Sequence, residues 1–234
     1  TIITLFPGVF TPVLSSSILG RAQKSGKIKI QTLNLRDFGI GRHRIVDDKP
    51  YGGGVGMVLR VDVIDEAIKA ARVKKSHEAG SGSAREAVIL LDPKGIVYKQ
   101  EVAEKFSKFE HLILICGHYE GFDERVRDLV DYEISLGDYI LSGGEIAAMV
   151  VVESVARLVK GVLVKEDAPE IESFSKNSHG RILEAPTYTR PPIWRGKKVP
   201  AVLLSGDFGK IEKYRTSQAA KITKQRRPDL TTDN

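Results

Sequence analysis

The sequence predicts an α/β protein with a mostly parallel sheet covered by helices on both faces, and two observations carry this prediction. Short, almost entirely apolar runs, such as residues 111–116 (HLILIC), have the composition of strands buried on both sides. Segments with helical spacing of apolar residues separate these runs, as expected for parallel strands joined by crossover helices. A hydrophobic content of 41% and a charged content of 28% are typical of a globular domain.

The predicted strands and helices alternate along the first two thirds of the chain. Turn residues such as Pro7-Gly8 bound the strands, and Thr11-Pro12 provides an N-cap and a first-turn proline for the first helix. Strands are predicted at residues 2–6, 27–33, 87–91, 111–116 and 132–136. Helices are predicted at residues 11–24, 62–75, 99–109, 122–130 and 146–159. The last of these is apolar on nearly every face, so we expect it to be buried on most sides.

Three loops follow predicted strands and are expected to lie at the carboxyl edge of the sheet. They are residues 92–95 (DPKG), 117–121 (GHYEG) and 137–144 (GDYILSGG). Ligands of open α/β sheets gather at this edge, and glycine lets a ligand approach the backbone closely. The loops are therefore predicted to share one pocket, although a glycine-rich turn is also a common plain connector.

Three stretches of the chain are expected to be irregular. Residues 34–58 include DDKPYGGGVGM, in which no Gly-Lys-Ser/Thr triplet follows the glycines, so the segment does not form a Walker loop. Residues 76–85 (SHEAGSGSAR) read as a polar linker. A second linker, residues 163–178, is expected to separate a domain at 1–162 from a smaller one at 179–234, which contains a helix at 209–227.

The net charge of +6 is concentrated near the end of the chain. Residues 176–234 hold 13 Lys/Arg and 5 Asp/Glu, a balance of +8, while the remainder carries −2. Such asymmetry favours a nucleic acid as partner, the alternative being a merely solvated surface. No run approaches the roughly 20 apolar residues of a membrane span, and no signal peptide is recognised. With Cys116 as the single cysteine, we expect a cytoplasmic protein without an internal disulfide.

Six blocks of the sequence resemble a known family when read in order. The blocks look like those of the bacterial tRNA (guanine-N1)-methyltransferases of the TrmD type. In chain order they are VDDKPYGGGVGM, LLDPKG, ICGHYEGFDERV, SLGDYILSGGE, PTYTRPPIWRG and VLLSGDFGKI. The resemblance covers essentially the whole chain. It implies the SPOUT class of methyltransferase fold, with a trefoil knot late in the catalytic domain, although general rules of chain topology disfavour knots.

The resemblance also implies an activity and its partners. The expected reaction transfers a methyl group from S-adenosylmethionine to N1 of guanosine at position 37 of tRNA. Residues 1–162 would be the S-adenosylmethionine-binding catalytic domain and residues 179–234 a basic helical tRNA-binding domain. A homodimer with active sites at the subunit interface is implied, with neither membrane nor DNA as partner. A Mg²⁺ requirement is compatible with the family, but no Cys/His spacing indicates a structural metal.

The resemblance assigns the donor-binding residues to the three loops. These residues are Leu91, Pro93, Gly117, Tyr119, Glu120, Leu136, Gly137, Asp138, Tyr139, Ile140, Leu141, Gly143 and Gly144. The backbone of 136–141 is expected to read the adenine edge. The Asp47-Asp48 pair and the glycines of 52–56 would lie near the target guanine and the phosphates, or else form a solvated turn.

Two residues match catalytic positions of the family. Arg157 matches its catalytic arginine; the plainer interpretation is an ion pair with Glu153, and the two roles are compatible. The general base falls on Glu172, before Ser173-Phe174, where the family pattern has aspartate. The extra methylene of glutamate would shift the carboxylate by about 1 Å. The nearby acids Glu166, Asp167 and Glu170 therefore stay open as alternatives.

A second departure concerns His118, which stands where the family pattern has arginine and so removes a fixed charge. Two other functions remain open on the sequence. One is an RNA methyltransferase of the same class that acts on a different nucleoside, which DDKPYGGGVGM argues against. The other is a non-catalytic RNA-binding module, suggested by the departures at His118 and Glu172.

Overall fold

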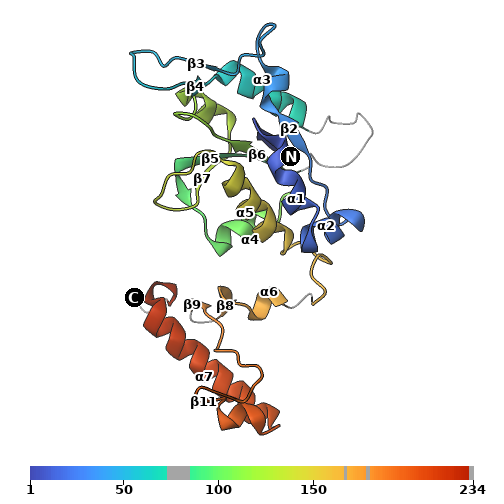
Figure 1. Ribbon diagram of the computed structural model, residues 1–234, viewed down its shortest axis with the longest axis vertical. Helices are drawn as coiled ribbons and strands as arrows, with labels where there is room; N and C mark the ends of the chain where they lie inside the picture. The colour runs from blue at the N-terminus through green and yellow to red at the C-terminus, as the bar shows by residue number, and fades with distance from the viewer. Residues whose placement is uncertain (73–84, 166–167, 178–179, 232–234) are drawn as a thin grey trace. The chain divides into compact units, whose positions relative to one another are not determined.

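A five-stranded parallel sheet forms the centre of the larger of two units. The computed structural model describes residues 1–72, 85–165, 168–177 and 180–231, and the chain divides into Thr1–Val164 and Lys165–Asn234. The strands of the sheet lie in the order β2-β1-β6-β5-β7, and every neighbouring pair is parallel (Figure 1). Their bounds are β1 Ile2–Thr4, β2 Thr32–Asn34, β5 Glu86–Val97, β6 His111–Cys116 and β7 Tyr132–Ser135. The predicted α/β class is thus confirmed.

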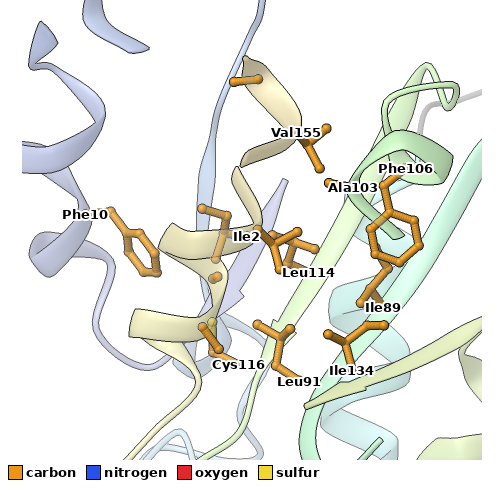
Figure 2. Packing of buried hydrophobic residues seen from close by; sticks show 14 of the residues in the cluster. Ile2, Phe10, Ile89, Leu91, Ala103, Phe106, Leu114, Cys116, Ile134 and Val155 are labelled. Atoms are coloured by element: carbon orange, nitrogen blue, oxygen red, sulfur yellow. The ribbon is translucent and has the colours of Figure 1, made fainter. Parts of the chain in front are cut away.

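Alternate side chains of each strand enter one of two apolar cores, one on each face of the sheet. On β5, Ile89 and Leu91 belong to the first core, and Val88 and Leu90 belong to the second. Figure 2 shows the first core, with Phe10 at one end of the cluster and Phe106 at the other. Both faces are covered, which explains why the strands read as continuous apolar runs.

Different helices cover the two faces of the sheet. The first core contains residues of α1 Thr11–Leu14, α2 Ser17–Lys24, α4 Gln100–Phe106 and α5 Glu145–Ala156. The second contains residues of α3 Val61–Ala71 and of the 3₁₀ helices η2 Leu35–Phe38 and η3 Glu124–Leu129. Figure 1 shows α3 on one side of the sheet and α4 and α5 on the other. No helix in the described ranges is long and apolar enough to cross a membrane.

The helix predicted over 11–24 is interrupted, so the prediction of one continuous helix is wrong. The hydroxyls of Ser15 and Ser16 donate to the carbonyl oxygens of Thr11 and Pro12, at 2.7 Å and 2.5 Å. Ser17 then takes a positive φ of 48°. Serine hydroxyls that bond back to the helix backbone compete with its continuation, and α2 starts afresh at Ser17.

Several other predicted bounds differ from the structure. The strand expected at 27–33 is limited to β2, although its sequence alternates. The helix expected at 62–75 ends at Ala71, and its last three residues, like most of the linker at 76–85, lie outside the described ranges. The segment 122–130 forms η3 rather than an α-helix, and 34–58 contains η2 and the pair β3 Asp47–Asp48 and β4 Val58–Leu59.

The turn expected at 92–95 exists, but the chain returns to the same strand after it. Both Leu91 and Ile96 pair with Ile134 of β7, so the four residues between them loop out of β5. The side chain of Asp92 accepts a hydrogen bond from the backbone N–H of Lys94 at 2.8 Å, which stabilises this loop. A bulge of this kind re-aims a strand next to a site.

The smaller unit consists of short elements around one long helix, α7 Phe208–Arg226. Thr223 of α7 is fully buried; its hydroxyl donates to Ala219 O at 2.7 Å and accepts from Leu183 N at 2.9 Å. The other elements of this unit are α6 Ala168–Ile171, β8 Ser175–Asn177, β9 Gly180–Ile182, β10 Ile193–Trp194, β11 Lys197–Lys198, η4 Ala201–Leu204 and η5 Pro228–Leu230. Within 163–178 the structure thus contains regular elements, α6 and β8, where the sequence indicated none.

Candidate functional site

A cavity of about 380 Å³ lies at the bulge of β5 and the carboxyl ends of β6 and β7, where the three predicted loops meet. Every donor-binding residue assigned from the sequence lines this cavity except Asp138, which is exposed. The lining residues from that prediction are Leu91, Pro93, Gly117, Tyr119, Glu120, Leu136, Gly137, Tyr139, Ile140, Leu141, Gly143 and Gly144. The convergence of the loops on one pocket is therefore a feature of the fold.

The second and third loops are joined directly through their backbones. The N–H of Gly144 donates to the carbonyl oxygen of Gly117 at 2.9 Å, and His118 pairs with Gly143 as an isolated antiparallel bridge. A Cβ on Gly144 would lie 2.7 Å from the Cα of Cys116, closer than such atoms approach in proteins. Glycine is required there because the two main chains touch.

The third loop is held at its beginning by a serine. The hydroxyl of Ser135 is 3.2 Å from both the N–H and the carbonyl oxygen of Gly137, whose φ is +150°. A Cβ on Gly137 would also lie 3.0 Å from the ring of Tyr139. These contacts fix the start of the loop and leave the backbone of 136–141 along one wall of the cavity.

His118 makes aromatic contacts at the rim of the cavity. Its ring centroid lies 5.1 Å from that of Phe6 and 5.2 Å from that of Tyr119, in tilted and edge-on arrangements that aromatic pairs favour. Tyr119 adopts a φ of +60°, an uncommon conformation for a non-glycine residue. The imidazole therefore packs between two rings at the rim of the cavity, a role that needs no fixed charge.

The glycine-rich loop at 52–56 adjoins the second loop of the cavity. Glu120 N donates to Met57 O at 3.0 Å, and Leu59 N donates to Gly121 O at 2.9 Å. A Cβ on Gly56 would lie 2.5 Å from the Cγ of Glu120, so glycine permits this contact. The DDKPYGGGVGM segment is thereby placed beside the cavity, with the side chain of Tyr51 fully exposed.

Sequence reasoning missed a buried polar contact behind the cavity. Thr4, which is fully buried, donates from its hydroxyl to Oε1 of Glu145 at 2.7 Å and accepts from Phe6 N at 3.0 Å. Burial, with the nearby Glu145 carboxylate, raises the pKa of the Cys116 thiol, which therefore stays protonated at neutral pH. A polar residue at the end of an apolar strand was the only signal for Thr4.

The two predicted catalytic residues belong to different units, and neither lines the cavity. Arg157 follows α5 as its C-cap, is half-buried, and donates its N–H to Glu153 O at 3.3 Å. Glu172 is also half-buried, and its carbonyl oxygen accepts from Ser175 N at 3.0 Å. Glu170 is exposed on α6, while Glu166 and Asp167 lie outside the described residues.

A metal has no evident binding site in the described part of the chain. Within those ranges, no group of three or more His, Cys, Asp or Glu side chains is arranged to hold an ion.

Comparison with known proteins extends over nearly the whole chain. Residues 1–233 match the family described as tRNA (Guanine-1)-methyltransferase TrmD. A tRNA (guanine-N(1)-)-methyltransferase of Chloroflexus aggregans is 50% identical over 231 residues, which cover 98% of this chain and 86% of that protein. Enzymes of the same name from Anoxybacillus flavithermus and Geobacillus kaustophilus are 49% and 50% identical over 230 residues, which cover 98% of this chain and 89% of each relative. The chain therefore belongs to the tRNA (guanine-1)-methyltransferase TrmD family.

Proposed function

We propose that this protein is an enzyme that transfers a methyl group from S-adenosylmethionine to N1 of guanosine at position 37 of tRNA. The observation that carries the proposal is the convergence of the three motif-bearing loops on one cavity, in a chain about 50% identical over almost its full length to tRNA (guanine-N(1)-)-methyltransferases. The nucleoside and the reaction follow from the names of these relatives. Position 37 follows from the resemblance of the motifs.

The cavity suits a small donor with an adenine ring and a flexible chain. Its volume of about 380 Å³ is within the range of small-molecule sites. The backbone of 136–141 would present N–H and carbonyl groups to the adenine edge, and Gly117 and Gly144 keep the floor free of side chains. When bound, S-adenosylmethionine supplies an electrophilic methyl group on a sulfonium centre.

Two side chains are proposed to act on the guanine. Neutral guanine carries a proton on N1, so the Glu172 carboxylate accepts that proton as N1 bonds to the methyl carbon. The guanidinium of Arg157 stabilises the negative charge that develops on O6. A positioned base contributes about 100-fold or more, and alignment of the reacting atoms contributes much of the rest. The products are 1-methylguanosine and S-adenosylhomocysteine.

A knot in the larger unit is supported by the route of the chain after β7. Strand β5 separates β7 from β6 in the sheet, yet the chain leaving β7 returns to β6, where Gly144 N bonds Gly117 O. The chain therefore crosses the carboxyl end of β5 before α5 begins. We propose that this crossing is part of the trefoil knot of the SPOUT class.

A homodimer is proposed on the apolar surface around α5. The sequence predicts a helix buried on most sides, but Ile146 is 55% exposed and Val150 is 41% exposed. Val9 and Val13, on the neighbouring η1 Pro7–Phe10 and on α1, are exposed as well. Side chains of this kind favour burial against a second copy, which would bring the subunit interface close to the cavity-forming loop that precedes α5.

The larger unit is proposed to bind the methyl donor, and the smaller unit is proposed to bind tRNA. The larger unit holds the donor cavity, and the basic α7 of the smaller one offers lysines and arginines for tRNA phosphates. Action on tRNA would place the enzyme in the cytoplasm.

Methyl transfer from a radiolabelled donor to tRNA transcripts tests the proposed function. A transcript with guanosine at position 37 is expected to accept label at N1, and a transcript with adenosine there is expected to accept none. Label that persists after this replacement would show that another nucleoside is the substrate. Donor binding without any transfer would indicate an inactive RNA-binding module.

A further inference from the structure

The smaller unit carries a short β-hairpin that exposes the only tryptophan of the chain. Strands β10 and β11 pair antiparallel, with Trp194 opposite Lys197. Arg195 and Gly196 form the turn with φ values of +47° and +77°, as a two-residue type I′ hairpin requires. Trp194 and Ile193 are each 55% exposed. The tight turn therefore presents a large aromatic side chain on a small and well-defined support.

The indole of Trp194 is paired with a guanidinium on its own hairpin. The Cζ of Arg195 lies 4.7 Å from the centroid of the indole ring, within the range of cation–π attraction. Aromatic rings and arginine planes are the surfaces on which proteins stack unpaired bases. An exposed tryptophan leaves apolar surface in water, so a partner that covers the ring gains binding energy.

The segment around the hairpin is positively charged without compensation. Residues 185–206 include Arg190, Arg195, Lys197 and Lys198 and no acidic residue. No ion pair joins the three cations of the hairpin to another residue of the described chain. A groove of about 1120 Å³ begins at the base of the hairpin, where Val199 N bonds Pro192 O at 2.9 Å.

The hairpin, rather than the groove, is the electrostatic feature of this region. The charges that line the groove cancel. Its basic residues are Lys165, Arg190 and Arg215, and its acidic residues are Glu170, Glu184 and Glu212. At the hairpin, by contrast, aromatic surface and uncompensated positive charge coincide. A purely apolar protein partner would use the indole and Ile193 but would have no need of the cations.

We propose that Trp194 and Arg195 form a stacking platform for an unpaired base of the tRNA, and that Lys197 and Lys198 contact the phosphates beside it. The proposal rests on the proposed function, since it takes the tRNA substrate as the ligand. It goes further by assigning one base-stacking contact to one hairpin. The platform is a binding element and takes no part in methyl transfer.

Intrinsic fluorescence tests the platform directly, because Trp194 is the only tryptophan in the chain. Titration of the full-length protein with tRNA is expected to quench the emission of Trp194 as a base stacks on the indole. A single-stranded oligoribonucleotide is expected to quench it as well, and a blunt duplex of the same sequence is expected to leave it unchanged. Unaltered emission at tRNA concentrations that saturate binding would overturn the proposal.

Substitutions separate stacking from charge. Trp194→Ala is expected to weaken tRNA binding about 5- to 150-fold, whereas Trp194→Phe should stay within about threefold of wild type. The double change Lys197→Ala/Lys198→Ala should reduce the slope of log affinity against log salt by about 1.4 to 1.8. Lys99→Ala/Lys108→Ala removes the same charge from exposed lysines of the larger unit and is the matched control.

The outcomes distinguish failure of the platform from failure of the proposed function. Trp194→Ala with unchanged tRNA affinity, in a protein that still methylates guanosine 37, would overturn the platform and leave the function intact. The same result, combined with loss of binding to another protein, would assign the hairpin to a protein partner. Circular dichroism of each variant verifies that the exposed substitutions leave the fold unchanged.

Discussion

The hydroxyl of Thr4 donates a 2.7 Å hydrogen bond to Oε1 of Glu145 and thereby joins the end of β1 to the first turn of α5. Glu145 directly follows the two glycines that close the cavity. The contact therefore ties the residue after the third loop to β1. Glu145 is half-buried, so its carboxylate is partly shielded from water and depends on the hydroxyl of Thr4 for this hydrogen bond.

Thr4→Val is expected to lower the free energy of unfolding by about 1.5–3 kcal/mol, because valine keeps the shape but leaves the carboxylate without this donor. The dissociation constant for the methyl donor S-adenosylmethionine should also rise, because the third loop loses an anchor. Denaturant unfolding and calorimetric donor titration measure the two effects. Thr11→Val, which makes the same change at an exposed position, is the control. Equal stability of the two variants would contradict a structural role for the Thr4 hydroxyl.

Gly144→Ala is expected to weaken donor binding strongly and to lower the melting temperature. The new Cβ would lie 2.7 Å from Cys116 Cα and 2.8 Å from Gly117 N, and backbone atoms cannot move aside without shifting the loop. Gly8→Ala serves as the matched control, because its Cβ would meet nothing within 4 Å. Wild-type donor affinity in Gly144→Ala would show that the two loops can separate without cost to the cavity.

Glu172→Gln and Arg157→Ala are each expected to reduce turnover about 100-fold or more while donor affinity stays within a few fold. The expectation follows from their proposed roles as base and as electrostatic stabiliser, and from their absence from the cavity lining. Single-turnover methylation and donor titration separate the two quantities. Glu170→Gln changes an exposed acid nearby and should remain active. Near-normal turnover in Glu172→Gln would assign the base to a neighbouring acid.

Ile146→Glu is expected to convert the proposed dimer to a monomer, because a charge cannot be buried cheaply in an apolar interface. Light scattering coupled to gel filtration measures the mass at micromolar concentration. Val164→Glu places the same charge at a residue that is 94% exposed and should leave the mass unchanged. A dimeric Ile146→Glu protein would place the interface elsewhere.

The sequence alone predicted the fold class and the convergence of the three loops on one pocket. Its apolar runs identified β5, β6 and β7, and the loops after them proved to line one cavity, since parallel strands end at one edge of a sheet. Residue spacing alone did not show two interruptions. Ser15 and Ser16 interrupt a helix by bonding back to its carbonyls, and the turn at 92–95 returns to the strand it left.

Only the tertiary structure revealed the contacts that shape the site. Thr4 and Glu145 are 141 positions apart, so neither periodicity nor spacing links them. Most of α5 is buried, as its apolar composition predicts, but Ile146 and Val150 are exposed in the single chain, because burial depends on what surrounds a helix as well as on its composition. The motifs predicted which residues form the site, whereas long-range packing explains why Gly144 must be glycine and brings the ring of His118 against that of Phe6.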